Sequence, residues 1–185
     1  MIAKVWLRNK ISDLLRNPVF DLLHFFILRM ISTLMKIPLC DEIFTHKQIS
    51  LINKFTPQEL LGSGLNIGLI IDLTCTDRYY DKVLFERMGI QHQKLGCVGH
   101  DIPSHQIFKK FIRLVEDFLI ANSNNGKLIG VHCTHGVNRT GYLICRYMIQ
   151  RQGMDRQKAI AEFNNSRGNN IDRQNYLDNL QKSSW

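Results

Sequence analysis

A short apolar run that turns within a few residues into a helical pattern constrains this fold more than any other feature of the sequence. Residues 128–131 (Leu-Ile-Gly-Val) predict a buried strand, and the apolar spacing after Arg139 predicts a helix that begins near that residue. A chain that turns from strand to helix so quickly can point successive backbone N–H groups inward, at the positive end of the helix dipole. The sequence therefore predicts an anion-binding loop at the carboxyl end of a strand.

The rest of the chain alternates apolar runs with amphipathic helical patterns, as expected for one α/β domain. Strands are predicted at 35–38, 69–74 and 91–97, and helices at 45–54, at 104–122, from Asp155 onward and around 176–180. The run 69–74 is apolar and rich in branched side chains, which is typical of a central strand buried on both faces. We therefore predict a three-layer α/β fold in which helices flank a central, mainly parallel sheet.

Residues 1–34 form an atypical apolar N-terminal segment ahead of a domain that covers 35–185. The stretch 19–34 is apolar but includes an aspartate, a histidine and an arginine. A membrane-spanning helix needs about 20 mostly apolar residues and is destabilised by charges near its middle. We therefore expect a packed or surface helix, which would begin at Asn17 and run through this stretch, and no membrane association.

The net charge and the cysteine content restrict the possible functions of the protein only weakly. The formal net charge of +8 favours anionic partners such as nucleic acid, acidic lipid or polyphosphate, although a solvated basic surface accounts for it equally well. The five cysteines are odd in number and lack disulfide-like spacing, which favours a reducing intracellular compartment. In that compartment a cysteine flanked by histidine and glycine is more plausibly reactive than structural.

The residue types at 132–141 (His-Cys-Thr-His-Gly-Val-Asn-Arg-Thr-Gly) match the chemistry of phosphoryl transfer. Cys133 would share the inward amides and the helix dipole, which favour the thiolate and lower its pKa from an ordinary value of about 8.5. Arg139 can fold back so that its planar guanidinium donates two parallel hydrogen bonds to phosphoryl oxygens. Thr140 can donate its hydroxyl hydrogen to the sulfur and so help the thiolate to leave.

We call residues 133–139 the cradle. The candidates for phosphate binding are Thr134, His135, Gly136, Val137, Asn138 and Arg139, and His132 is predicted to orient the cysteine. Gly136 and the later Gly141 remove side chains where the backbone must approach the anion or the packed helix. A metal cluster of His132, Cys133 and His135 is the less favoured alternative, because metal-bound sulfur would leave the arginine without a role.

Further segments accompany this motif in a fixed order: 70–74 with Arg78-Tyr79-Tyr80, the turn at 98–100, and residues 173–176. Together they resemble the RNA 5′-phosphatases, a branch of the cysteine-dependent, dual-specificity phosphatase superfamily. That branch includes RNA-binding dual-specificity phosphatases, baculovirus RNA phosphatases and, at greater distance, the triphosphatase domains of animal mRNA capping enzymes. The resemblance covers about residues 35–182, so 35–185 is predicted to be the catalytic domain.

The resemblance implies an enzyme that removes the γ- and then the β-phosphate of 5′-triphosphate RNA through a cysteinyl-phosphate intermediate, without a metal or other cofactor. It further implies a nuclear protein whose partners include RNA, ribonucleoprotein complexes and, with weaker activity, phosphoproteins. We also expect a monomer, although no sequence feature bears on the oligomeric state. The main alternative is a dual-specificity phosphatase acting on phosphotyrosine and on phosphoserine or phosphothreonine. A noncatalytic binder of 5′-phosphorylated RNA is the second alternative.

The candidate for a general acid favours RNA ends over phosphoproteins. Protein phosphatases of this superfamily protonate the leaving group with an aspartate on a loop about 30–40 residues before the cysteine. Here the loop 99–104 offers Asp101, whose position beside His100 departs from the usual pattern. A triphosphate end needs little proton donation, because its leaving group is a phosphate with a second pKa near 6.

Four residues near the family-like segments are candidates for RNA binding: Arg78, Arg173, Lys94 and Tyr79. The basic side chains could contact the RNA backbone, and the tyrosine could stack on a base. Asp72 ends a predicted strand, so we expect it to orient the following loop by hydrogen bonding and to take no part in catalysis.

Overall fold

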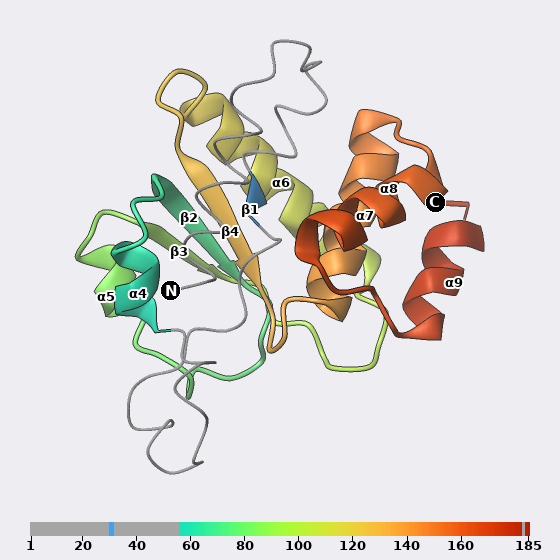
Figure 1. The fold of residues 1–185 in the computed structure, drawn as a ribbon, viewed down its shortest axis with the longest axis horizontal. Coiled ribbons are helices and arrows are strands. Elements are labelled where there is room, and N and C mark those ends of the chain that lie inside the picture. The colour runs from blue at the N-terminus through green and yellow to red at the C-terminus, as the bar shows by residue number, and fades with distance from the viewer. Residues whose placement is uncertain (1–29, 32–55, 183) are drawn as a thin grey trace.

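Four parallel strands form a sheet in the order β1-β4-β2-β3 (Figure 1). The structure, a computed structural model, describes residues 30–31, 56–182 and 184–185. In chain order the elements are β1 (Met30–Ile31), α4 (Pro57–Leu61), β2 (Ile67–Asp72), α5 (Val83–Glu86), β3 (Gln91–Lys94), α6 (His105–Ala121), β4 (Leu128–His132), α7 (Asn138–Gln152), α8 (Arg156–Arg167) and α9 (Gln174–Lys182). Asp72 pairs with His132, so the carboxyl ends of β2 and β4 lie side by side.

Helices cover both faces of the sheet, with α4 and α5 on one face and α6 to α9 on the other (Figure 1). Every residue of β2 is buried. Leu69 and Ile71 pack into the larger core with Phe111, whereas Ile70 packs into the smaller core with Phe85. Because successive side chains of a strand point to opposite faces, the one apolar run serves both cores. The predicted three-layer α/β fold with a parallel sheet is therefore confirmed.

The long helix α6 was predicted at its full length. Ser104 accepts a hydrogen bond from the Ile107 amide at its start, and Asn122 follows its last residue. The predicted strands are confirmed with shifted ends, since β2 runs from Ile67 to Asp72 and β3 stops at Lys94. At the carboxyl end of β2 the Asp72 side chain accepts the Thr74 amide hydrogen and so fixes the turn that follows the strand.

Two short helices were not predicted from the sequence. α4 begins with a capping box in which Thr56 and Glu59 each accept the other's backbone N–H, a pattern that the Thr-Pro-Gln-Glu sequence already indicates. α5 has only four residues, which are too few for a helical periodicity to reveal it.

The structure of residues Met30 and Ile31 shows that one prediction was wrong. They lie in the stretch expected to be helical, yet they form a strand that pairs with Ile129 and Gly130 of β4. The pairing provides hydrogen-bond partners for backbone groups along that side of β4, which a local helix would not do. The sequence of the stretch does not reveal this advantage. The rest of 1–34, the predicted strand 35–38 and the predicted helix 45–54 lie outside the described residues. No helix in the described part of the chain is long and apolar enough to cross a bilayer.

Candidate active site

The cradle joins the end of β4 to the start of α7. Gly136 has a φ of 63°, a left-handed conformation that glycine adopts without steric cost. No side chain caps the first turn of α7, so its backbone N–H groups stay available to an anion. A Cβ on Gly141 would come within 2.6 Å of Phe163 and 2.8 Å of Ile171, so a larger residue here would push the helix away from its neighbours.

Arg167, at the end of α8, holds the cradle from outside. Its Nε donates to the Gly136 carbonyl at 2.9 Å and its Nη2 to the His135 carbonyl at 3.0 Å. In a trans peptide the carbonyl and the following N–H point in opposite directions. Drawing these two carbonyls outward therefore aims the N–H groups of Gly136 and Val137 into the cradle.

Cys133 is buried at the floor of the cradle, and its surroundings favour the thiolate. Burial alone would raise the pKa of Cys133. Hydrogen bonds from the Thr140 hydroxyl and amide, the Arg139 charge and the His135 amide outweigh it, so the pKa lies below its ordinary value. The Thr140 hydroxyl is buried and has no oxygen or nitrogen hydrogen-bond partner within the described ranges, which leaves it available to the sulfur.

The Arg139 guanidinium is anchored on one edge. Its Nη1 donates to the carbonyls of Cys97 at 3.0 Å and Leu73 at 3.4 Å, and its Nη2 donates to the Thr134 hydroxyl at 2.8 Å. A guanidinium has five N–H donors, so the Nε–H and one Nη2–H remain. These two lie on the same edge of the guanidinium and are suited to two parallel hydrogen bonds with phosphoryl oxygens.

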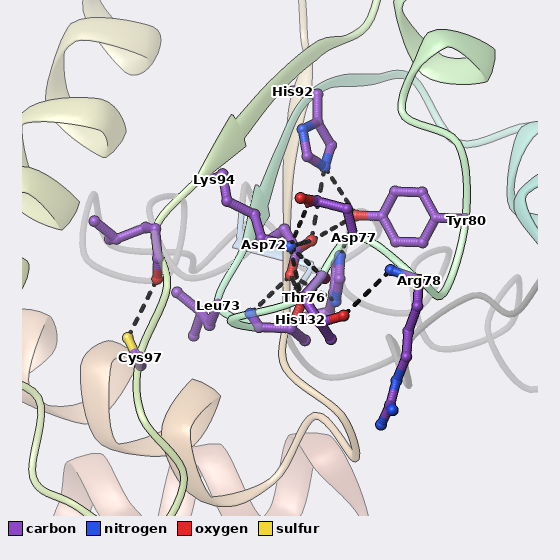
Figure 2. Close-up of polar contacts among 12 residues, drawn as sticks. Asp72, Leu73, Thr76, Asp77, Arg78, Tyr80, His92, Lys94, Cys97 and His132 are labelled. Carbon is purple, nitrogen blue, oxygen red and sulfur yellow. Dashed lines mark hydrogen bonds and ion pairs between the residues drawn. The ribbon is translucent and has the colours of Figure 1, made fainter.

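Buried polar side chains gather beneath the cradle at the ends of β2, β3 and β4 (Figure 2). The Tyr80 hydroxyl lies 2.7 Å from His132 Nε2, 2.9 Å from His92 Nε2 and 3.3 Å from Asp72 Oδ2. Burial would raise the pKa of Asp72, but His132 and hydrogen bonds from Lys94 and Thr74 lower it, so the carboxylate is ionised and only accepts. Tyr80 therefore donates to Asp72, and both imidazoles donate their Nε2–H to Tyr80.

This arrangement orients His132, the residue that precedes the candidate nucleophile Cys133. Burial lowers the pKa of His132 to about 4, so its ring is neutral at physiological pH. The bond to Tyr80 then selects the Nε2–H tautomer and fixes the ring plane. Asp72 also accepts from the Thr74 amide and hydroxyl, which confirms the expected role of this aspartate in orienting the loop.

Replacing Tyr80 with phenylalanine should lower the free energy of unfolding by about 1–3 kcal/mol, because Asp72 loses a donor and two imidazole N–H groups lose their acceptor in a buried site. Urea denaturation measures this loss. Tyr147→Phe is the matched control, since the Tyr147 side chain is buried to a similar extent and its hydroxyl makes no hydrogen bond in the described residues. Equal stability of the Tyr80 variant and wild type would contradict the proposed arrangement.

The loop 99–104, which carries the general-acid candidate, is held by the start of α9. Arg173 is hydrogen-bonded to the His100 ring, Asn175 donates to the His100 carbonyl at 2.7 Å, and Tyr176 donates to the Asp101 carbonyl at 2.8 Å. The Asp101 side chain is exposed and makes no hydrogen bond or ion pair within the described segments. The structure thus fixes the backbone of this loop and leaves the carboxylate unengaged.

The four RNA-binding candidates differ in how far their side chains are available. Lys94 donates to Asp72, Thr74 and the Thr76 carbonyl and forms an ion pair with Asp77, and Arg173 is engaged with His100. Arg78 and Tyr79 contact each other at the edge of the cradle, with 3.3 Å between Nη2 and the phenol oxygen. Tyr79 and Arg78 are therefore the more available pair.

A family model for the catalytic domain of dual specificity phosphatases matches residues 51–184. This chain belongs to the dual-specificity phosphatase family. The described part of this phosphatase contains no group of three histidine, cysteine or acidic side chains that could hold a metal ion, and the stretch from His132 to His135 makes none.

Relatives of this phosphatase include an RNA/RNP complex-1-interacting phosphatase of Mus musculus, 52% identical over 69% of this chain and 41% of the relative. A tyrosine-protein phosphatase of Autographa californica nuclear polyhedrosis virus is 41% identical over 78% of this chain and 84% of the viral protein. This chain thus spans about two fifths of the length of the mouse relative. A solved protein tyrosine phosphatase from Leishmania major has the same fold, with a TM-score of 0.61 at 17% identity over 82% of this chain and 86% of that one.

One side chain that supports the cradle of this phosphatase, Arg167, was missed in the sequence. Arg167 resembles an ordinary basic residue in the last turn of a helix, and nothing nearby reveals its carbonyl partners. The Asn138 side chain supports the cradle as well, since its Oδ1 accepts the amide hydrogens of Asp172 and Arg173 at 3.1 Å. Its backbone amide stays a candidate for phosphate binding.

Proposed function

We propose that this phosphatase removes the γ- and then the β-phosphate from the 5′ end of triphosphate RNA. The observation that supports it most is that one cradle holds both a cysteine with a lowered pKa and an arginine that keeps two donors available for phosphoryl oxygens. The reaction needs a thiolate nucleophile and a stabiliser for charge on the transferred group. Both requirements are met by Cys133 and Arg139.

The proposed chemistry has two steps. The Cys133 thiolate attacks the γ-phosphorus, a sulfur–phosphorus bond forms, and the bond to the β-phosphate oxygen breaks to release diphosphate RNA. Water then attacks the cysteinyl phosphate, and inorganic phosphate leaves as the thiolate re-forms. The Thr140 hydroxyl stabilises the departing thiolate by hydrogen bonding. A second cycle on the diphosphate end yields monophosphate RNA.

Two observations favour RNA ends over phosphoproteins. The mouse relative is named for interaction with an RNA/RNP complex. The exposed Asp101 carboxylate makes no contact that would position it as a proton donor, and a phosphate leaving group needs little protonation. The second candidate, a protein phosphatase, is favoured by the name of the viral relative, a tyrosine-protein phosphatase.

The test compares phosphate release from 5′-triphosphate RNA with release from phosphotyrosine and phosphoserine peptides, with chelator present throughout. We expect a higher kcat/KM on RNA. Faster turnover of the peptides would reverse the assignment in favour of the protein phosphatase. RNA binding without release from any substrate would instead indicate a noncatalytic binder.

Replacing Asp101 with alanine should reduce kcat/KM on triphosphate RNA by less than about tenfold, because the leaving phosphate departs without a proton. Asp117→Ala, at an exposed position on α6, is the control for loss of one negative charge. A loss beyond about a hundredfold, the lower range for a general acid, would show that Asp101 protonates the leaving group.

A further inference from the structure

The segment that follows β2 lies along the edge of the cradle. Leu73 donates its amide hydrogen to the His132 carbonyl at 2.8 Å, and its own carbonyl accepts from Arg139. Residues 76–82, together with 92–94 of β3, line a groove beside this edge. A substrate with one phosphate in the cradle would therefore extend past this segment.

Three cations line this groove, and they differ in their partners. Lys94 is paired with two carboxylates, at 2.8 Å to Asp72 and 3.0 Å to Asp77. Lys82 lies 3.7 Å from Glu86. Arg78 has no carboxylate within 4.0 Å among the residues that the structure describes, and its side chain points away from the buried polar group around Asp72 (Figure 2). Its charge is therefore the least compensated of the three.

Tyr79 connects Arg78 to the cradle. The Arg78 guanidinium lies 5.1 Å from the centre of the Tyr79 ring and donates to its hydroxyl. The Tyr79 pKa is lowered chiefly by Arg78, with smaller contributions from Thr134 and Arg139. The contributions of Thr134 and Arg139 indicate that the Tyr79 hydroxyl faces the side of the cradle where Thr134 accepts from Arg139 Nη2.

The acidic residues of the groove leave Arg78 accessible to an anion. Asp77 is paired with Lys94 at 3.0 Å, and Asp81 accepts the Val83 amide hydrogen at 2.9 Å at the start of α5. Neither carboxylate is paired with Arg78. An anion next to the cradle would meet a planar guanidinium and a phenol hydroxyl, both of which can donate to phosphate oxygens.

We propose that Arg78 and Tyr79 form a second phosphate subsite that binds the leaving phosphate of a 5′-polyphosphate end while the transferred phosphate lies in the cradle. The inference rests on the proposed function, because only a polyphosphate carries a second phosphate directly attached to the first. The subsite stabilises negative charge that grows on the leaving oxygen in the transition state. It therefore selects polyphosphate ends over phosphate monoesters.

The test is the ratio of kcat/KM for 5′-triphosphate RNA to kcat/KM for p-nitrophenyl phosphate, which offers the cradle one phosphate and no second. Arg78→Ala should lower this ratio by about 10- to 100-fold, the loss expected for a hydrogen bond to a charged group. Arg78→Lys should give a smaller loss, since it keeps the charge without the planar fork. Lys82→Ala, which removes a cation from the same groove, should change the ratio less than about threefold.

Kinetics on a free nucleoside triphosphate show whether Arg78 contacts the phosphates or the rest of the RNA chain. The same loss on free nucleoside triphosphate and on RNA supports a phosphate subsite, whereas a loss confined to RNA would overturn it in favour of a contact with the nucleotide chain. Equal losses from Arg78→Ala and Lys82→Ala would also overturn it, because general electrostatic attraction would then suffice. If wild type releases phosphate from RNA and Arg78→Ala leaves the ratio unchanged, the subsite fails while the proposed function stands. If wild type releases none, both fail.

Discussion

Replacing Cys133 with serine should abolish phosphate release from triphosphate RNA, with a loss on the order of 10⁴-fold or more in kcat. A serine hydroxyl is not ionised at neutral pH, and the surrounding donors cannot lower its pKa far enough to make it a comparable nucleophile. The backbone amides of the cradle and Arg139 remain, so the RNA should still bind. Single-turnover phosphate release and fluorescence anisotropy with labelled RNA measure the two effects separately.

Cys75→Ser is the matched control for the nucleophile, since Cys75 is an exposed thiol outside the cradle. Its rate should stay within about twofold of wild type, as is usual for a surface substitution. Release at the wild-type rate by the Cys133 variant would exclude covalent catalysis by this sulfur. Failure of that variant to bind RNA would show that the thiolate itself is needed to form the cradle.

Replacing Arg139 with lysine should lower kcat on triphosphate RNA by about 10²–10³-fold, the range for removing one preorganised donor to a developing charge. Lysine keeps the positive charge, but it cannot contact the Leu73 and Cys97 carbonyls and at the same time present two parallel N–H groups to the phosphate. Steady-state kinetics on triphosphate RNA measure the loss, and urea denaturation shows whether the fold is retained.

Arg151→Lys, on the exposed face of the same helix, is the control for an arginine-to-lysine change in α7. Its ion pair with Glu116 lies away from the cradle, so the rate should remain close to that of wild type. A near-normal kcat in the Arg139 variant would mean that charge alone suffices, and the fork geometry would then have no catalytic role.

The sequence by itself indicated the layer architecture and the place of the cradle. The alternation of apolar runs and amphipathic patterns is a local property. It predicted β2 and β4 from their continuous apolar runs and α6 from apolar residues at helical spacing. The cradle could also be predicted from local sequence, because Cys133, Gly136 and Arg139 lie within one turn from strand to helix. Asp72 could be assigned to the following loop for the same reason, as its partner Thr74 lies two residues away.

Only the tertiary structure decided which side chains support this local motif from a distance. Arg167 reaches carbonyls more than 30 residues away, Tyr80 meets His132 across 52 positions, and Arg173 contacts His100 across 73. Such contacts form at the edge of the sheet where the ends of the parallel strands meet the ends of the helices between them. The periodicity of the sequence does not predict these contacts. Partners that are distant in the chain and adjacent in space also decide two further features. They pair Met30–Ile31 with β4, and they engage Lys94 while Arg78 stays available.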